Sequence, residues 1–260
     1  HMAERHPFKV VMLCRDDDTA RIMYHGLVPD WDIVGVIIEQ KPSTRQMLQR
    51  RMRKLGIWTV LGQVLFMLYT RLVGVRLAKA AREALLSAEQ VTVAAFPSDK
   101  VRHVASANDP ETIRLLQAWN PDAVVVNGTR ILSPSVLSSV SGPFINTHAG
   151  ITPRYRGVHG GYWALARHDA AHCGVTVHLV DEGIDTGSVL YQAVIEVGPD
   201  DSFVTYPLRQ VIKAAPLMSQ ALSDVKHGRL RPQVGVGPSG LWSHPTLWEY
   251  LANWLRSGVK

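Results

Sequence analysis

Residues 144–157 run Phe-Ile-Asn-Thr-His-Ala-Gly-Ile-Thr-Pro-Arg-Tyr-Arg-Gly. The apolar start predicts a β-strand, and the Pro-Arg-Tyr-Arg-Gly segment predicts a turn directly after it. Asn146 and His148 are one residue apart, so in an extended strand their side chains point to the same side. A later acid, Asp185, lies 37 positions beyond the histidine in a Gly-rich run. This combination predicts an acyl-transfer site.

The three polar side chains supply the groups that acyl transfer to an amine requires. A neutral imidazole at His148 can take a proton from the attacking nucleophile. The Asn146 carboxamide can donate a hydrogen bond to a developing oxyanion, and the Asp185 carboxylate can orient the histidine or hold a water. The chain has no Gly-x-Ser-x-Gly motif, which weighs against serine hydrolysis. Its histidines lack a trusted ligand spacing, so we expect no metal.

The N-terminal part of the chain predicts an α/β fold. Residues 8–14 and 32–38 are apolar, strand-like runs on either side of a predicted helix, and this strand-helix-strand order predicts a parallel sheet. Glu39 follows the second strand, as an acid does in dinucleotide-binding folds. No Gly-x-Gly-x-x-Gly follows the first strand, so we expect no dinucleotide site. Further strands are predicted at 91–96, 101–105, 123–126, 174–180 and 188–197.

Residues 42–90 differ in composition from the rest and predict a helical insertion. A dense basic run at 45–54 precedes an uncharged apolar stretch at 55–70, which is shorter than the roughly 20 residues that a membrane span needs. Two interpretations stay open. The segment packs as a helical hairpin on the domain or in a homodimer interface, or residues 45–82 form a basic amphipathic surface on an anionic membrane.

Composition sets broad limits. The net charge of +6 and pI near 9.5 indicate a polyanionic partner, such as nucleic acid, a nucleotide phosphate or an anionic lipid. The two isolated cysteines, Cys14 and Cys173, suit a reducing cytoplasm. We expect a main domain over 2–195 and a small helical C-terminal extension over 196–260.

Residues 144–192 resemble the catalytic half of the folate-dependent formyltransferases. The matching motifs are Asn146-Thr-His148, Pro153-x-x-x-Gly157, Gly174-x-Thr176-x-His178 and Asp185-Thr-Gly187. Upstream, Asn127-Gly-Thr-Arg130-Ile131-Leu132 resembles the family's pterin-contacting segment. The resemblance implies a Rossmann-like, mostly parallel sheet flanked by helices. One departure is Gly150, where the family usually has Ser, and this predicts a more flexible loop.

The resemblance also implies residue roles. Asn146 would bind the formyl oxygen, His148 would assist proton loss from the amine, and Asp185 would couple to His148. Backbone atoms would hold the pterin of 10-formyltetrahydrofolate, the co-substrate, at Arg130, Ile131, Leu132, Asp181, Gly183 and Ile184. His178 lies on a predicted strand and either contacts the site or has a structural role.

Four residues after the catalytic pair are candidates for the substrate site. Tyr155 and Arg156 can contact a phosphate or sugar, although a surface salt bridge fits equally well. His159 and Trp163 begin the next predicted helix, where Trp163 suits either the core or a stacking platform.

Three acceptor classes compete within the family, and we expect a nucleotide-linked amino sugar and no nucleic-acid partner. Members that act on methionyl-tRNA carry a C-terminal β-barrel, whereas the last residues here are predicted to be helical. Glycinamide ribonucleotide enzymes bind phosphate with a Gly-Ser-Asn turn, whereas this chain has three carboxylates at 16–18. The remaining acceptor is a GDP- or dTDP-linked 4-amino-4,6-dideoxy sugar for O-antigen lipopolysaccharide, with GDP-perosamine favoured.

The resemblance therefore implies a cytoplasmic N-formyltransferase, with the inner membrane surface as an alternative location. A membrane-docked binding protein with a relic pocket is the non-enzymatic alternative.

Overall fold

The computed structural model describes residues 7–260, so the expected domain start at residue 2 lies outside the described part. Its centre is a seven-stranded sheet with the order β3-β2-β1-β4-β5-β7-β8. The first five strands in this order are parallel, and β7 and β8 are each antiparallel to the preceding neighbour. The expected Rossmann-like, mostly parallel sheet is confirmed. The strands are β1 (Lys9–Cys14), β2 (Asp32–Glu39), β3 (Val101–Val104), β4 (Ala123–Asn127), β5 (Phe144–His148), β7 (Gly174–Leu179) and β8 (Val189–Val194).

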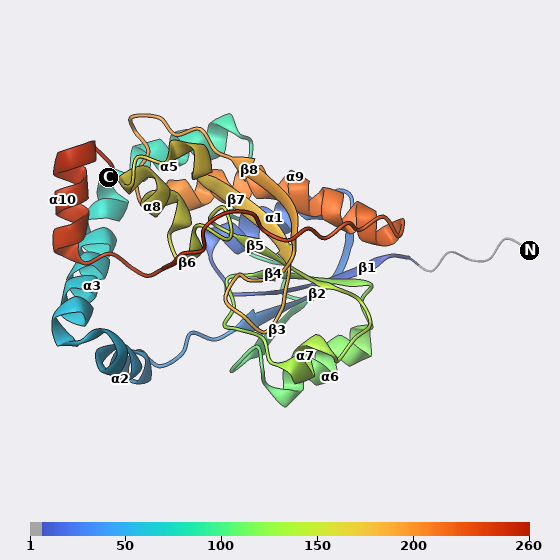
Figure 1. Ribbon diagram of the computed structural model, residues 1–260. Coiled ribbons are helices and arrows are strands. Elements are labelled where there is room, and N and C mark those ends of the chain that lie inside the picture. Colours follow the sequence, from blue (N-terminus) through green and yellow to red (C-terminus); the bar gives the residue numbers. More distant parts are fainter. Residues whose placement is uncertain (1–6) are drawn as a thin grey trace, which may run out of the picture.

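Helices cover both faces of the sheet (Figure 1). Helix α1 (Asp18–Leu27) and helix α9 (Tyr206–Lys226) lie on one face, and α6 (Pro110–Trp119) and α7 (Pro134–Leu137) lie on the other. Strand β1 explains this layering, because its successive side chains point to opposite faces. Val10 and Met12 join the core under α1 and α9, whereas Val11 and Leu13 join the core under α6 and α7.

The expected insertion is helical. It consists of α2 (Thr44–Leu55), α3 (Ile57–Tyr69), a π-helical turn (Thr70–Gly74), α4 (Val75–Leu77) and α5 (Lys79–Ala88). The strand predicted at 91–96 is wrong, since these residues form an extended loop. Their apolar side chains, including Phe96, pack on the core without pairing to a strand, and β3 occupies the sheet edge beside β2.

The C-terminal part departs from the expected extension. Helix α9 packs against α1 and β7, so the main core reaches to Leu222, beyond the boundary expected at residue 195. Pro216 lies inside α9 without dividing it. Its position is exposed, so water can solvate the carbonyl group that the proline leaves unpaired.

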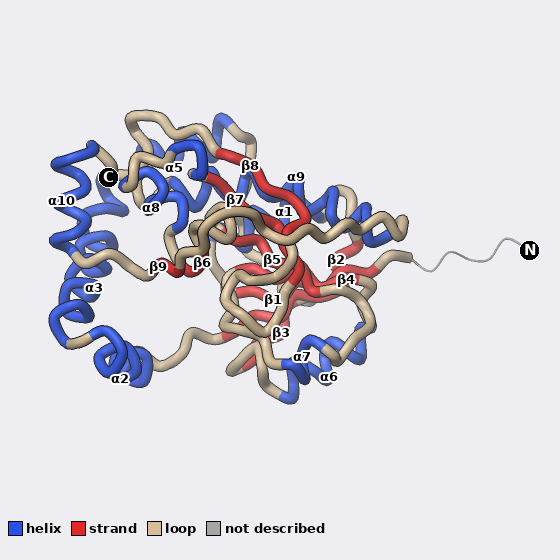
Figure 2. Tube along the Cα trace, in the orientation of Figure 1, coloured by secondary structure: helices blue, strands red, loops and turns tan. Residues whose placement is uncertain are grey.

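After α9 the chain runs back across the molecule to its opposite end (Figure 2). On the way β9 (Leu241–Trp242) pairs with β6 (Arg156–Gly157), which belongs to the turn after β5. Helix α10 (Leu247–Ser257) then packs on α3 and contacts α8 (Gly160–Ala166), which in turn contacts the 3₁₀ turn Ala170–His172. This return segment, residues 227–246, therefore contacts the turn that directly follows Asn146 and His148 in the sequence.

Candidate active site

The register of β5 and β7 brings the predicted residues together. Asn146 is paired with His178, and His148 is paired with Thr176. Because the two strands are antiparallel, the carboxyl end of β5 lies beside the start of β7. The loop after β7 brings Asp185 back against both histidines. His148 and His178 are buried, and the Asp185 side chain is 15% exposed. The site is therefore a polar cluster whose acid retains access to solvent.

Asp185 lies at the centre of this cluster. Its Oδ2 lies 3.2 Å from His148 Nδ1 and accepts a hydrogen bond from the Gly157 amide at 3.0 Å. Its Oδ1 lies 3.5 Å from His178 Nε2. The backbone of Asp185 has a φ of 50°, in the left-handed region that is uncommon for residues other than glycine. The loop thus keeps an unfavoured backbone conformation that directs this carboxylate at both histidines.

The hydrogen bonds define the protonation of His148. Its Nε2 lies 2.6 Å from the Tyr155 carbonyl oxygen, and because a carbonyl only accepts, Nε2 carries a proton. The other nitrogen, Nδ1, faces the Asp185 carboxylate. Any proton that reaches this pair therefore ends between Nδ1 and Oδ2.

The hydrogen bonds also fix the orientation of Asn146. His178 Nδ1 donates to the Leu179 carbonyl at 2.8 Å, so in the neutral ring Nε2 is an acceptor. Asn146 Nδ2 donates to that Nε2 at 3.1 Å. The carboxamide nitrogen has two hydrogens, and this bond uses one of them. The other can be donated to a substrate oxygen.

Electrostatics keep the pair ready to accept a proton. Burial is the main influence on His148 and lowers its pKa, against the opposing effects of Asp185 and the Tyr155 carbonyl. For Asp185, burial raises the pKa, but His148, His178 and the Gly157 amide together outweigh it and lower the pKa below its usual value. We therefore assign a neutral imidazole and an ionised carboxylate to the resting site.

Gly150 stands where the family usually has Ser, and close packing explains why this turn needs glycine. A Cβ atom on Gly150 would lie 2.4 Å from the Tyr155 carbonyl oxygen and 2.8 Å from His148 Nε2. Gly150 thus permits the close approach that forms the hydrogen bond between these two residues. This close approach gives the glycine a packing reason in addition to the flexibility expected from the sequence.

The proposed pterin segment is fixed by an acid outside the predicted site. Glu39 is buried and accepts hydrogen bonds from the amides of Ala107 at 3.0 Å and Arg130 at 3.1 Å. It also pairs with the Arg130 and Arg15 guanidinium groups. The Arg130 amide is thereby used within the protein, and the Ile131 carbonyl oxygen accepts a hydrogen bond from Asn108 Nδ2 at 2.9 Å. Leu132 is buried, whereas the Ile131 side chain is 48% exposed and available to a ligand.

The loop after β7 has its own internal support. The Asp181 carboxylate accepts from the Gly183 amide at 3.0 Å and from the Thr186 hydroxyl at 2.7 Å. Ile184 remains 37% exposed. The Arg156 guanidinium donates to the Ile184 carbonyl at 3.0 Å, and its Nε donates to Ser239 Oγ at 3.0 Å. Arg156 therefore connects the Asp185 loop to the return segment.

Three of the four candidate substrate residues have partners within the protein. The Tyr155 side chain is buried and its hydroxyl donates to Asp169 at 2.8 Å. His159 is bonded to His244 at 2.9 Å. Trp163 donates to the Ser243 carbonyl and stacks on Trp242. The sequence could not reveal these partners, because most of them come from the return segment.

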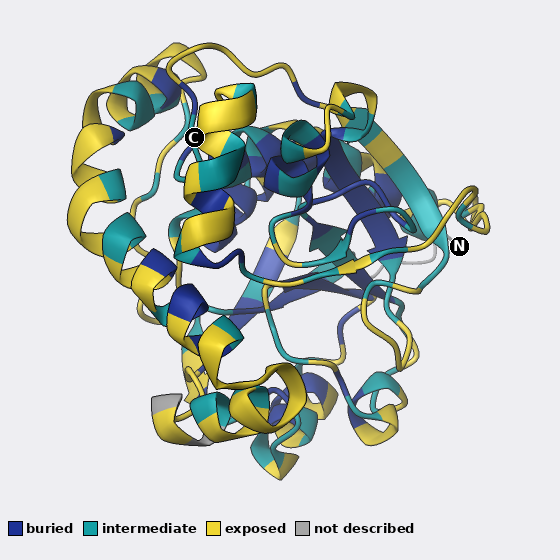
Figure 3. Cartoon of the chain, turned by 60° about the vertical axis from the view of Figure 1, so that its left-hand side comes forward, coloured by how far each residue is buried: buried dark blue, intermediate teal, exposed yellow. Residues whose placement is uncertain are grey.

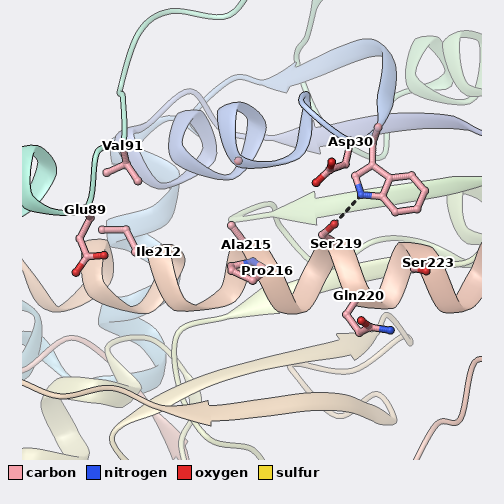
Figure 4. A pocket seen from close by; sticks show the side chains of 11 residues that line it. Asp30, Glu89, Val91, Ile212, Ala215, Pro216, Ser219, Gln220 and Ser223 are labelled. Atoms are coloured by element: carbon pink, nitrogen blue, oxygen red, sulfur yellow. Dashed lines mark hydrogen bonds between the residues drawn. The ribbon is translucent and has the colours of Figure 1, made fainter.

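Two surface hollows were found away from this cluster. One has a volume of about 720 Å³ between α1 and α9, where Trp31 Nε1 donates to Ser219 Oγ at 2.8 Å (Figure 4). The other adjoins α5 and α10 and has a volume of about 610 Å³. Neither is lined by Asn146, His148 or Asp185, so the cluster itself defines the candidate site.

The fold and the cluster define an α/β protein equipped for acyl transfer. The formyl transferase family model matches residues 67–222, more than half of the chain, and the chain therefore belongs to the formyl transferase family. The one-carbon donor of this family is 10-formyltetrahydrofolate, as the resemblance implied. The match confirms the resemblance to formyltransferases at the level of the family.

Curated relatives match only part of the chain. A methionyl-tRNA formyltransferase from Synechococcus sp. (strain JA-3-3Ab) is 36% identical over 125 residues, which is 48% of this chain and 38% of that protein. The trifunctional purine biosynthetic protein adenosine-3 of Drosophila melanogaster is 34% identical over 125 residues, which is 46% of this chain and 9% of that protein. The matched region is thus less than half the length of these relatives.

Solved structures share the fold over most of the chain. A sugar N-formyltransferase from Shewanella has a TM-score of 0.55 at 14% identity and covers 91% of this chain and 77% of its own. A glycinamide ribonucleotide transformylase from Symbiobacterium toebii has a TM-score of 0.57 at 18% identity, covering 89% of this chain and 95% of its own. At these identities the similarity establishes the fold alone.

Proposed function

We propose that this protein transfers the formyl group of 10-formyltetrahydrofolate to the amine of a nucleotide-linked 4-amino-4,6-dideoxy sugar in the cytoplasm. The observation that carries the chemistry is the cluster in which Asp185 faces both His148 and His178, while His178 orients Asn146. This arrangement supplies one oxyanion donor and one proton acceptor side by side.

Each group has a defined part in the reaction. The acceptor amine attacks the formyl carbon, and the carbonyl oxygen becomes an oxyanion. Asn146 donates its second amide hydrogen to that oxyanion. The proton released by the amine is taken up by the His148–Asp185 pair. When the bond between the formyl carbon and the folate nitrogen breaks, the pair returns this proton to the leaving nitrogen, so the protein ends the reaction unchanged.

The pterin is proposed to lie against the segment that Glu39 holds and against the loop after β7. The exposed Ile131 and Ile184 side chains offer apolar contacts. Neighbouring residues in the same two segments can supply polar backbone contacts, namely Arg130, Leu132, Asp181 and Gly183. Such a mixture of apolar surface and a few polar groups suits an aromatic ring system with polar edges.

The loop after β1 supports an acceptor other than glycinamide ribonucleotide. The Asp17 carboxylate accepts from the Ala20 amide at 2.9 Å and caps α1. It therefore occupies the helix end that would otherwise attract a phosphate. Asp16 and Asp18 are paired with Arg21 and Arg82. Sugar N-formyltransferases and a glycinamide ribonucleotide transformylase share the fold to a similar extent, so the choice of acceptor depends on this loop.

Methionyl-tRNA is the second candidate acceptor, because the curated methionyl-tRNA formyltransferases are 31% to 36% identical over the matched region. The described residues after β8 form α9, the return segment and α10, and they pack on the catalytic domain and the insertion.

The test is a formyl-transfer assay with 10-formyltetrahydrofolate and three kinds of acceptor. The panel contains GDP-perosamine, dTDP- and UDP-linked amino sugars, glycinamide ribonucleotide and methionyl-tRNA, and mass spectrometry detects the added formyl group. Formylation of an amino sugar alone supports the proposal. Formylation of glycinamide ribonucleotide or methionyl-tRNA alone refutes the acceptor, and formylation of nothing refutes the activity.

Two variants separate the chemistry from the fold. His148→Ala should abolish transfer, whereas His103→Ala, an exposed histidine on β3, should leave the rate unchanged. Equal activity in both variants would show that the cluster does not catalyse the reaction. Thermal unfolding of each variant confirms that the comparison is made between folded proteins.

A further inference from the structure

The insertion contains a long apolar helix that lies along the domain. Residues Ile57–Leu77 form a continuous helical stretch of 21 residues with a mean hydropathy of 1.4, long and apolar enough by itself to cross a membrane. One side is anchored to the protein. Phe66 is buried against Phe203 and Tyr250, and Gln63 Nε2 donates to the His244 carbonyl at 2.8 Å. These contacts hold the helix on the surface of the domain.

The opposite side of this helix exposes a row of large apolar side chains. Their spacing of three and four residues places them on one face. Helix α10 continues the apolar surface, since Trp248 packs over Gly62 and Leu255 is 88% exposed. Figure 3 shows the exposed sides of these helices. The row consists of Trp58 (74% exposed), Leu61 (43%), Leu65 (38%), Leu68 (48%) and Leu72 (55%).

The insertion is strongly basic, and its two acids, Glu83 and Glu89, lie near its end. Residues 44–82 contain nine basic side chains and no acidic one, so this segment alone exceeds the net charge of +6 of the whole chain. Arg50, Arg53 and Lys54 before the apolar helix are exposed, as are Arg71 and Arg76 within it. The apolar row is therefore flanked by positive charge at its start and along its second half.

This combination selects one occupant for the surface. A second copy of the chain would bring two strongly basic insertions together, and the two acids of each insertion, Glu83 and Glu89, would leave most of that charge unneutralised. RNA would neutralise the charge but would leave the leucine row in water. An anionic lipid surface satisfies both requirements, because its headgroups attract the basic residues and its upper acyl layer takes up the leucines and tryptophans.

We propose that α3, α4 and α10 form a peripheral membrane-binding surface for anionic lipids, with the Ile57–Leu77 helix parallel to the bilayer. This inference is independent of the proposed reaction. It would place a formyltransferase at the membrane face without inserting its catalytic domain.

The test is co-sedimentation of the purified protein with two kinds of vesicle, one of phosphatidylcholine and one containing phosphatidylglycerol as well. We expect binding only to the anionic vesicles, weakened by salt. Arg50→Gln combined with Arg53→Gln should reduce partitioning about 30-fold, since each basic residue near an anionic surface contributes a factor of about five. Trp58→Ser combined with Leu72→Ser should abolish binding.

Matched controls use equivalent residues outside this surface. Arg229→Gln with Arg231→Gln removes two exposed charges beyond the C-terminal end of α9, and Val234→Ser with Val236→Ser removes two valines that are 86% and 93% exposed. Neither control should change partitioning. The proposal is refuted by absence of vesicle binding, by binding that the α2 and α3 variants do not alter, or by a dimer or RNA complex that those variants abolish in place of vesicle binding.

Discussion

His148 Nδ1 lies 3.2 Å from Asp185 Oδ2, while the opposite ring nitrogen lies 2.6 Å from the Tyr155 carbonyl. The imidazole is thus held between two oxygen acceptors, one neutral and one charged. Its backbone partner fixes the ring orientation, so that only Nδ1 can exchange a proton with a reacting group. The acid beside Nδ1 stabilises the imidazolium that forms when the ring gains this proton.

Asp185→Asn should therefore lower kcat by about 100-fold or more, the usual effect of losing a proton-transfer group. The amide keeps the size of the side chain but cannot stabilise a protonated His148. KM for the acceptor should change less than kcat. Steady-state kinetics at several pH values provides the measurement, and the control is Asp30→Asn, an exposed acid distant from β5 in sequence. A kcat within a factor of about two of wild type would contradict this role.

Asn146 and His178 should have separable effects. Asn146→Ala removes the oxyanion donor and should lower kcat about 100- to 1,000-fold with little change in KM. His178→Ala removes the partner at 3.1 Å that orients the amide, so we expect a smaller loss of kcat. His178→Gln, which keeps a side-chain acceptor, should recover part of it. The outcome that contradicts this assignment is an equal loss in His178→Ala and Asn146→Ala without recovery in the glutamine variant.

Gly150→Ala tests the close packing beneath the histidine. Its Cβ would lie 2.4 Å from the Tyr155 carbonyl, so the turn must move and the hydrogen bond to His148 Nε2 must lengthen. We expect a free energy of unfolding lower by about 1–3 kcal/mol and a reduced kcat. Urea denaturation and kinetics measure the two effects. For comparison, Gly198→Ala places its Cβ at an ordinary contact distance of 3.7 Å from the nearest side chain and should leave kcat unchanged.

Local patterns in the sequence were sufficient to predict most strands of the sheet, including β5 with the catalytic pair. The apolar runs predicted β1, β2, β4, β5 and β7, and the Asn-x-His spacing predicted side chains on one face. His178 was left open, since its inclusion depends on the register of β5 against β7. The alternation of side chains along β7 was the available signal, but such alternation alone does not specify the register of one strand against another.

Long-range packing limited the remaining predictions. Tyr155, His159 and Trp163 follow the catalytic pair in sequence, but their side chains contact Asp169 and the return segment. No local pattern indicates that residues 239–244 pass this turn. Glu39 was noticed for its position after a strand, yet its role in holding Arg130 depends on a residue 91 positions away.

The half-buried pair His159 and His244, which lies near Arg51 of α2, should make stability depend on pH. Burial, reinforced by His244 and Arg51, lowers the pKa of His159 to about 3, and burial with Arg51 lowers the pKa of His244 to about 4. In the unfolded chain both would titrate near 6.5. Between these values the unfolded state binds more protons, so the free energy of unfolding falls as pH decreases from about 6.5 towards 4. Above about 6.5 this contribution is constant.

His244→Gln removes one of these two titrating imidazoles. The slope of the free energy of unfolding between pH 6 and about 4.5 should decrease by up to about 1.4 kcal/mol per pH unit relative to wild type. Urea titrations across this range measure the difference. His103→Gln on the exposed edge of β3 should keep the wild-type slope, and an unchanged slope in His244→Gln would contradict the assignment.

Glu39→Gln tests whether the Arg130–Leu132 segment binds folate. The carboxylate accepts from two amides and two guanidinium groups. A carboxamide keeps only one oxygen acceptor, and its NH₂ group cannot accept hydrogen bonds from the remaining donors. The lost bonds should cost about 1–3 kcal/mol of stability and displace the segment. KM for 10-formyltetrahydrofolate should then rise several-fold more than KM for the acceptor, while Glu111→Gln, a surface acid paired with Arg114, should change neither. If Glu39→Gln loses stability but keeps the folate KM, the segment does not hold the pterin, because its displacement would have no effect on binding.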